Sequence, residues 1–127
     1  MTSHLRNSVS RQFIHDITCA MERIAPLKLA DNTWDNVGLL AESPLPLNDR
    51  LILVVNDLSS QVVAEAISKK ASMIISYHPP WFKAAKNIRL DGPLANINYC
   101  VSHGISVFSP HTALDSISGG SKYKKTP

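Results

Sequence analysis

The feature that most constrains the fold is the alternation of short apolar runs with helical segments between residues 51 and 108. Residues 51–55, 73–77 and 105–108 form three continuous apolar runs. Runs of this length are typical of strands that are buried on both faces of a sheet. Helical patterns separate the runs. A β-α-β-α-β order predicts parallel strands joined by right-handed crossovers, so we expect an α/β fold.

The helices in this alternation have start and stop signals. Ser59 or Ser60 can cap a helix that continues to about residue 70. Its expected inner face consists of Val62, Val63, Ala66 and Ile67. Pro93 suits the first turn of a second helix, and Gly104 is placed to end it.

The region before the alternation predicts one helix and one short strand. The apolar residues spaced by three or four positions predict a helix after Ser10 that ends near Pro26. They are Phe13, Ile14, Ile17, Met21 and Ile24. Residues 37–41 read as a strand. We therefore expect a flexible N-terminus (residues 1–11), an α/β domain (residues 12–118) and a Lys-rich tail (residues 119–127).

Charge and composition exclude several classes of function. The net charge of +3 comes entirely from Lys122, Lys124 and Lys125, so the body of the chain is balanced and no basic groove for nucleic acid is expected. No apolar run approaches the length of a membrane-spanning helix. Cys19 and Cys100 lie in predicted helices, and we expect both to be small buried apolar residues in a reducing compartment.

Polar side chains follow each of the three predicted parallel strands. Asn56 and Asp57 follow the first, His78 follows the second, and His111 and Asp115 follow the third. Ligands bind at the carboxyl ends of parallel strands, and imidazole with carboxylate suits a divalent metal such as zinc, iron or manganese. His78 can equally be a structural histidine, Asp57 an Asx-turn residue and Asp115 a helix cap.

Aromatic residues lie close in sequence to these candidates. For Trp34 we expect a packing role rather than a substrate platform, and for Tyr77, which ends a strand, packing is the default. Trp81 and Phe82 could cover a pocket or roof the core.

Four ordered motifs resemble the NIF-three-like family, whose members are also known as GTP cyclohydrolase I type 2 homologs. They are Trp-Asp-Asn-Val-Gly-Leu-Leu (34–40), Val-Asn-Asp-Leu (55–58), Ile-Ser-Tyr-His-Pro-Pro-Trp-Phe (75–82) and Ser-Pro-His-Thr-Ala-Leu-Asp (109–115). The resemblance covers about residues 12–120. It implies an α/β fold that assembles into toroidal hexamers, in which many members carry two metal ions.

The resemblance also assigns residues. His78 and Asp115 match metal ligands, and His111 matches a position lining the same pocket, which makes it a candidate for proton transfer. Tyr77 stands where many bacterial members have a second ligating His. The family's remaining ligands come from a C-terminal His-x-x-x-Glu motif that this sequence lacks. We therefore expect a truncated form, without the second half of the family fold, whose metal binding is weak or absent.

Two functions follow from the resemblance. The first is divalent-metal-dependent hydrolysis of a nucleotide or another phosphorylated substrate, in a form with an incomplete site. The alternative is a non-catalytic protein that binds protein partners such as transcription regulators. The resemblance implies a homo-oligomer with no membrane or direct nucleic-acid partner. The expected location is cytoplasmic, with mitochondrial or nuclear alternatives.

Overall fold

The predicted alternation of strands and helices is present in the computed structural model, which describes residues 3–46 and 48–118. The elements of this alternation are β2 (Ile52–Val55), α2 (Ser60–Ser68), β3 (Met73–Ser76), α3 (Ala95–Ser102) and β4 (Ser106–Ser109). β3 pairs in parallel with both β2 and β4. The parallel α/β core is therefore confirmed, while the predicted tail of residues 119–127 lies outside the described residues.

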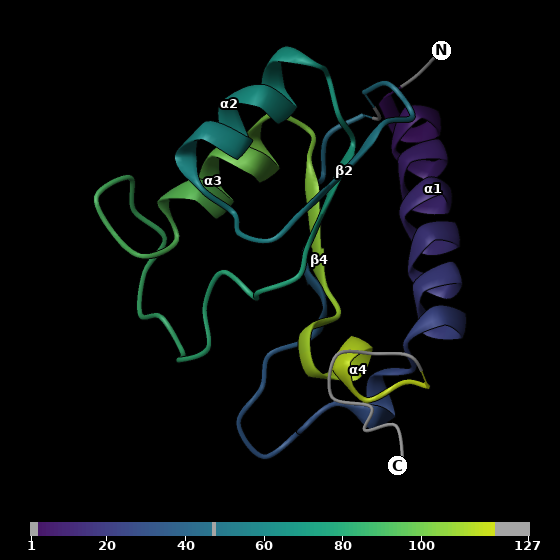
Figure 1. Cartoon of the computed structure of the whole chain (residues 1–127). Coiled ribbons are helices and arrows are strands. Elements are labelled where there is room, and N and C mark those ends of the chain that lie inside the picture. Colours follow the sequence, from purple (N-terminus) through teal and green to yellow (C-terminus); the bar gives the residue numbers. More distant parts are fainter. Residues whose placement is uncertain (1–2, 47, 119–127) are drawn as a thin grey trace, which may run out of the picture.

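A fourth strand and a long helix complete the sheet and its second face. β1 (Gly38–Ala41) pairs antiparallel with β4, which gives the strand order β1-β4-β3-β2. α2 and α3 lie on one face of the sheet, and α1 (Ser3–Ile24) lies on the other (Figure 1). A short 3-10 helix (Leu27–Leu29) follows α1, and α4 (His111–Asp115) follows β4. None of the described helices is long and apolar enough to cross a membrane.

Alternate residues of the central strands supply the two cores. Ile74 and Val107 face α2 and α3 in a cluster that also includes Cys100. Met73 and Phe108 face α1 and pack with Ile14. This alternation follows from the pleat of a strand, because successive side chains point to opposite faces of the sheet.

The N-terminus differs from its prediction. A helix after Ser10 was expected, whereas α1 begins at Ser3. The flexible segment expected for residues 1–11 stays a prediction. Residues 3–12 contain neither Gly nor Pro. No helix-breaking residue therefore prevents the helix from extending toward the N-terminus. Its end at Ile24, before Pro26, agrees with the prediction.

Two burial predictions are wrong. β2 was expected to be buried on both faces, but it is an edge strand of the described sheet and Val54 is 76% exposed. Cys19 was expected to be buried, but it is exposed, because it lies away from the apolar stripe of α1 and beside His15. Cys100 is buried as predicted.

The predicted helix signals at Ser59 and Gly104 are confirmed. Pro93 was expected in the first turn of the second helix, but it precedes α3, which begins at Ala95 after the N-cap Leu94. The Ser59 hydroxyl accepts a hydrogen bond from the Val62 amide at 3.2 Å and caps α2. Gly104 follows the end of α3 with a φ of +79°. A Cβ there would lie 2.9 Å from Asn48 Nδ2, so both the conformation and the space favour glycine.

Candidate functional site

The polar residues that follow the strands are held at one edge of the sheet by main-chain and serine hydrogen bonds. The Tyr77 amide donates to the Val55 carbonyl at 2.9 Å, which ties the end of β3 to the end of β2. The buried Ser109 hydroxyl donates to the Tyr77 carbonyl at 3.0 Å, which ties β4 to the same point. The carboxyl ends of the three parallel strands therefore converge, as the sequence predicted.

His78 lies at this edge and is oriented by a carboxylate. Its Nδ1 is 2.9 Å from Asp57 Oδ1, and its side chain is 49% exposed. A carboxylate accepts the hydrogen of Nδ1, which leaves Nε2 as the ring nitrogen that can bind a metal or exchange a proton. This carboxylate–imidazole arrangement is typical of metal-ligating histidines.

His111 is oriented in the same way by a residue far away in the sequence. Its Nδ1 is 2.9 Å from Oδ1 of Asp35, whose side chain has no exposed surface. The other oxygen of Asp35 accepts hydrogen bonds from the amide of Thr112, at 3.2 Å, and from its hydroxyl. These contacts hold His111 at a φ of +28°, a conformation that non-glycine residues rarely adopt.

Asp35 remains a carboxylate despite its burial. Loss of water around the group raises the pKa of Asp35. The hydrogen bonds from His111, Thr112 and the Asn36 amide lower this pKa by more, so the net pKa lies below the ordinary value. An ionised carboxylate only accepts hydrogen bonds. The Nδ1 of His111 must therefore carry the hydrogen, and in the neutral ring Nε2 is the proton acceptor.

Asp115, the second predicted metal ligand, is buried with 5% of its surface exposed. Its carboxylate accepts a hydrogen bond from the Tyr77 hydroxyl. Tyr77 was expected to have a packing role, but this bond gives its phenol a polar contact with a candidate ligand. Because the Tyr77 ring is also 4.8 Å from the His78 ring, one side chain contacts both predicted ligands.

The predicted site residues therefore gather in one cluster. The ring centroids of His78 and His111 are 5.5 Å apart, and Tyr77 is 5.3 Å from His111. In the part of the chain that the structure describes, however, no group of three or more His, Cys, Asp or Glu side chains is arranged to hold a metal ion. The donors are chemically suited to a divalent metal, but they make at most part of a coordination shell.

Sequence reasoning did not assign a role to Asp35, although the residue stands in the first motif of the resemblance. It is 76 positions from His111, so no spacing rule connects the two. The available signal was an acidic residue between Trp34 and Asn36 in a polar stretch, which by itself is also typical of a solvated loop.

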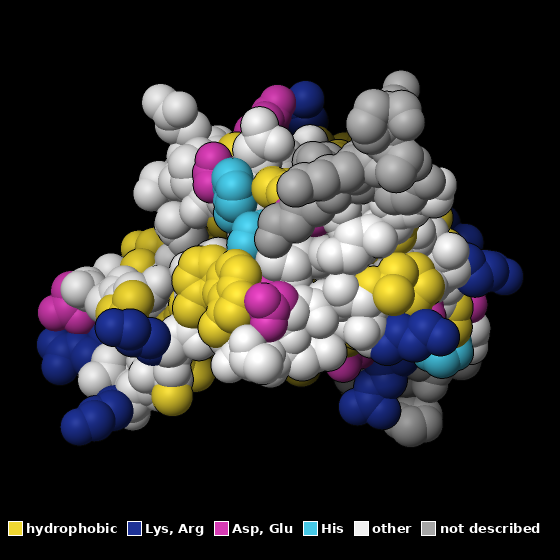
Figure 2. Space-filling model, turned by 60° about the horizontal axis from the view of Figure 1, so that its bottom comes forward, with side chains coloured by type: hydrophobic (Ala, Val, Ile, Leu, Met, Phe, Trp, Pro, Cys, Tyr) yellow, Lys and Arg dark blue, Asp and Glu magenta, His cyan; other side chains and the backbone are white. Residues whose placement is uncertain are grey.

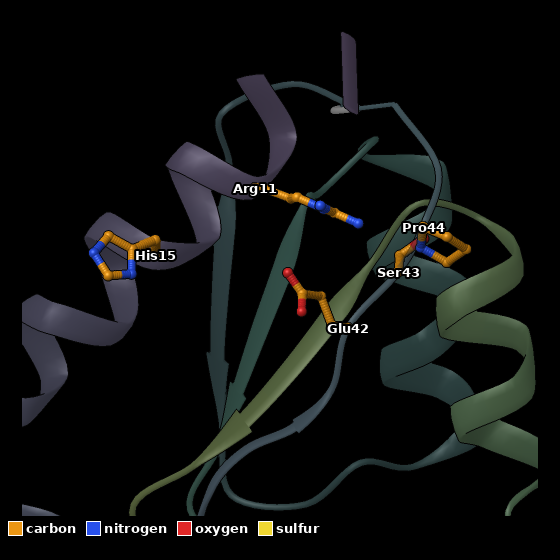
Figure 3. Close-up of a pocket in the computed structure, with 5 residues that line it drawn as sticks. All are labelled: Arg11, His15, Glu42, Ser43 and Pro44. Carbon is orange, nitrogen blue, oxygen red and sulfur yellow. The ribbon is translucent and has the colours of Figure 1, made fainter. Parts of the chain in front are cut away.

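A cavity of about 440 Å³ lies between α1 and the segment after β1. Its lining consists of Arg11 and His15 from the helix and Glu42, Ser43 and Pro44 from the segment. Arg11 extends toward Ser43 and Pro44, whereas the His15 ring points away from them (Figure 3). None of the predicted site residues lines this cavity, so it is separate from the histidine cluster.

Comparison with known proteins agrees with the motifs. The family model described as Duf34/NIF3 (NGG1p interacting factor 3) matches residues 13–124. The chain belongs to the Duf34/NIF3 family.

Relatives of the family differ from this chain in length. NIF3-like protein 1 of Drosophila melanogaster is 41% identical over 115 residues, which are 90% of this chain and 39% of that protein. The GTP cyclohydrolase 1 type 2 homolog of Clostridium acetobutylicum is 35% identical over 108 residues, which are 84% of this chain and 40% of that protein. The chain thus spans about two-fifths of the length of these relatives.

Solved structures show the same fold. The Bacillus cereus protein related to NIF3 superposes with a TM-score of 0.73 at 33% identity, over 84% of this chain and 29% of that chain. Staphylococcus aureus protein SA1388 gives a TM-score of 0.72 at 33% identity, over 80% of this chain and 33% of that chain. The α/β fold of the described residues is therefore the NIF3 fold over a third or less of these two structures.

Proposed function

We propose that this chain carries part of a divalent-metal-dependent hydrolase site that acts on a nucleotide or another phosphorylated substrate. The observation that supports this most directly is the pair of oriented imidazoles. Each of His78 and His111 has Nδ1 on a carboxylate, and the two rings are 5.5 Å apart. Two imidazoles whose Nε2 atoms are left for a ligand or a proton favour chemistry over packing.

In this proposal His78 and Asp115 hold the metal. A bound divalent metal supplies charge that activates water and stabilises negative charge on a phosphoryl group. His111 exchanges a proton at Nε2, because Asp35 keeps the hydrogen on Nδ1 and fixes the ring. Tyr77 positions the Asp115 carboxylate through its hydroxyl.

Two protein ligands bind a metal more weakly than the three or four of a typical protein site. The chain covers 39% of NIF3-like protein 1 of Drosophila melanogaster, and we infer that the further ligands belong to the part of the family sequence that this chain does not match. The proposal therefore assigns weak metal binding to this chain and full binding to the longer relative.

Metal content tests the proposal. This chain and the Drosophila relative are loaded with zinc or manganese, dialysed and measured by elemental analysis, and both are assayed for hydrolysis of GTP. We expect less than one metal per chain here and about one or more in the relative. His78→Ala should remove the remaining metal, whereas His103→Ala, a matched change at an exposed histidine outside the cluster, should not.

Two results would contradict the proposal. Stoichiometric metal in this chain would show that its site is complete without further ligands. Absence of both metal and hydrolysis in the longer relative would remove the basis of the hydrolase assignment.

The alternative function, a protein that binds other proteins without catalysis, has its own support. A cavity of about 390 Å³ with a largely apolar lining opens between α1, β2 and α4. Its lining includes Ile24 and Val54, which are strongly exposed for apolar residues. An apolar surface of this kind favours contact with another protein surface.

A further inference from the structure

Two large aromatic side chains next to the histidine cluster are half exposed. Trp34 is 50% exposed and Phe82 is 49% exposed. Their ring centroids are 5.8 Å apart. The centroid of the His111 ring is 5.9 Å from that of Trp34 and 6.0 Å from that of Phe82. Figure 2 shows an apolar patch directly beside histidine side chains on this face. Trp34 was expected to have a packing role; its ring does contact Phe82 and His111, but half of its surface stays exposed.

The loops that carry the two aromatic rings are held by part-buried hydrogen bonds of neighbouring residues. The Asn36 amide group donates to the Trp81 carbonyl at 2.9 Å, which ties the loop of Trp34 to the loop of Phe82. On the other side, the Asp31 amide donates to the Thr112 hydroxyl at 2.9 Å. Trp81 itself packs against the main core. The loops are thus fixed while the rings of Trp34 and Phe82 stay open, which is the arrangement of a preorganised contact surface.

Cations lie on the same side of the molecule. Lys83 follows Phe82 directly and Lys86 follows three residues later, and both are exposed. Among the described residues Arg89 is paired with Asp91 at 2.9 Å, whereas no ion pair involves Lys83 or Lys86. In Figure 2 lysine and arginine side chains lie on one side of the apolar patch, and an acidic side chain borders its other side. Positive charge beside exposed aromatic rings suits a ligand that is both planar and anionic.

We propose that Trp34 and Phe82 form a stacking platform for the planar aromatic ring of a nucleotide-class ligand, with its anionic group toward Lys83 and Lys86. The platform contacts His111, so the ligand's ring lies beside the same imidazoles to which the proposed function assigns chemistry. This inference rests on the proposed function only in taking the bound ligand to be the substrate that is hydrolysed. Stacking on the two rings needs no metal, so binding can be tested separately from hydrolysis.

The experiment is a titration of the metal-free chain, followed by NMR through its two tryptophan indole N–H signals. The probes are GMP, guanosine and ribose 5-phosphate. We expect GMP and guanosine to shift the Trp34 signal and to leave the Trp81 signal nearly unchanged, and ribose 5-phosphate to shift neither. Loss of one stacked aromatic ring weakens binding by about tenfold or more, so Trp34→Leu and Phe82→Leu should each have this effect on GMP.

Controls separate stacking from other causes. Tyr99→Leu makes the same type of change at an exposed aromatic residue on α3 and should leave GMP binding unchanged. Phe82→Trp keeps a ring and should retain binding, which distinguishes loss of the platform from loss of folding. Lys83→Gln with Lys86→Gln should weaken GMP but not guanosine.

Three outcomes would overturn the inference. They are no binding of GMP by the native chain, GMP binding unchanged in both Trp34→Leu and Phe82→Leu, and ribose 5-phosphate binding as tightly as GMP. If this chain binds GMP through Trp34 while the longer relative lacks both metal and hydrolysis, the stacking platform is supported and the hydrolase function is contradicted.

Discussion

At the residue scale, the carboxylate of Asp35 organises the candidate site. It is fully buried and accepts hydrogen bonds from His111, Thr112 and the Asn36 amide. A single side chain thereby orients one imidazole, anchors the start of α4 and supports a residue with positive φ. Replacement of one carboxylate oxygen by an amide NH2 leaves the donors to that oxygen without an acceptor, which is costly in a protein interior.

Asp35→Asn should therefore lower the free energy of unfolding by about 1–3 kcal/mol at neutral pH. The pKa of Asp35 is lowered in the folded chain, so its contribution is fully present above the unfolded pKa of about 4 and is lost as pH falls through the lower folded pKa. The stability difference between the native chain and Asp35→Asn should shrink below about pH 4. Urea denaturation at a series of pH values measures it.

Asp57→Asn is the matched control for this prediction. Asp57 makes the same type of contact with His78, but its side chain is 71% exposed, so the change should alter stability by less than about 0.5 kcal/mol. Equal destabilisation by the two substitutions would show that burial of Asp35 is not what gives it its effect.

At the element scale, the short helices depend on local caps. α2 has only nine residues, a length at which an isolated helix is unstable in water. Its first turn is closed by the Ser59 hydroxyl, which accepts from the Val62 amide. Val63 and Ala66 then bury the inner face of the helix against the sheet.

Ser59→Ala should lower the free energy of unfolding by about 1 kcal/mol, because the first turn of α2 loses its cap. Ser68→Ala, at an exposed position at the other end of α2, removes a hydroxyl that does not cap the first turn and should leave stability unchanged or slightly higher. Urea denaturation followed by circular dichroism measures both. A cap role is excluded when the two variants unfold at the same urea concentration.

At the scale of the whole molecule, the two faces of the sheet are covered unequally. α2 and α3 cover one face, and α1 lies on the other (Figure 1). An apolar cavity of about 390 Å³ is lined by residues of α1 and of the edge strand β2. Exposed apolar edge strands promote association with other chains. This cavity is the surface through which a protein-binding function would act.

The cavity should make the native chain bind the dye 1-anilinonaphthalene-8-sulfonate with increased fluorescence. Val54→Asp and Ile24→Asp each place a charge at its lining and should reduce the emission. Leu90→Asp changes an apolar residue that is 62% exposed elsewhere and should leave it unchanged. Near-ultraviolet circular dichroism verifies that all variants keep native packing, and equal emission from all of them would contradict the assignment of the dye to this cavity.

Local patterns in the sequence determined much of the fold. The β-α-β-α-β order, the cap at Ser59 and the turn at Gly104 depend on neighbouring residues, so they could be predicted without the structure. Convergence of His78, His111 and the strand ends also followed, because parallel strands end at one edge of the sheet. The motifs around these residues placed the chain in its family.

Tertiary structure decided the features that depend on distant pairs. His111 pairs with Asp35, 76 positions earlier, and the hydroxyl of Tyr77 donates a hydrogen bond to Asp115, 38 positions later. Strand order makes β2 an edge strand with an exposed Val54, although its apolar run resembles those of the buried strands. Burial, exposure and side-chain partners depend on which elements lie side by side in space, and a linear pattern carries that information only where neighbours in sequence are also neighbours in the fold.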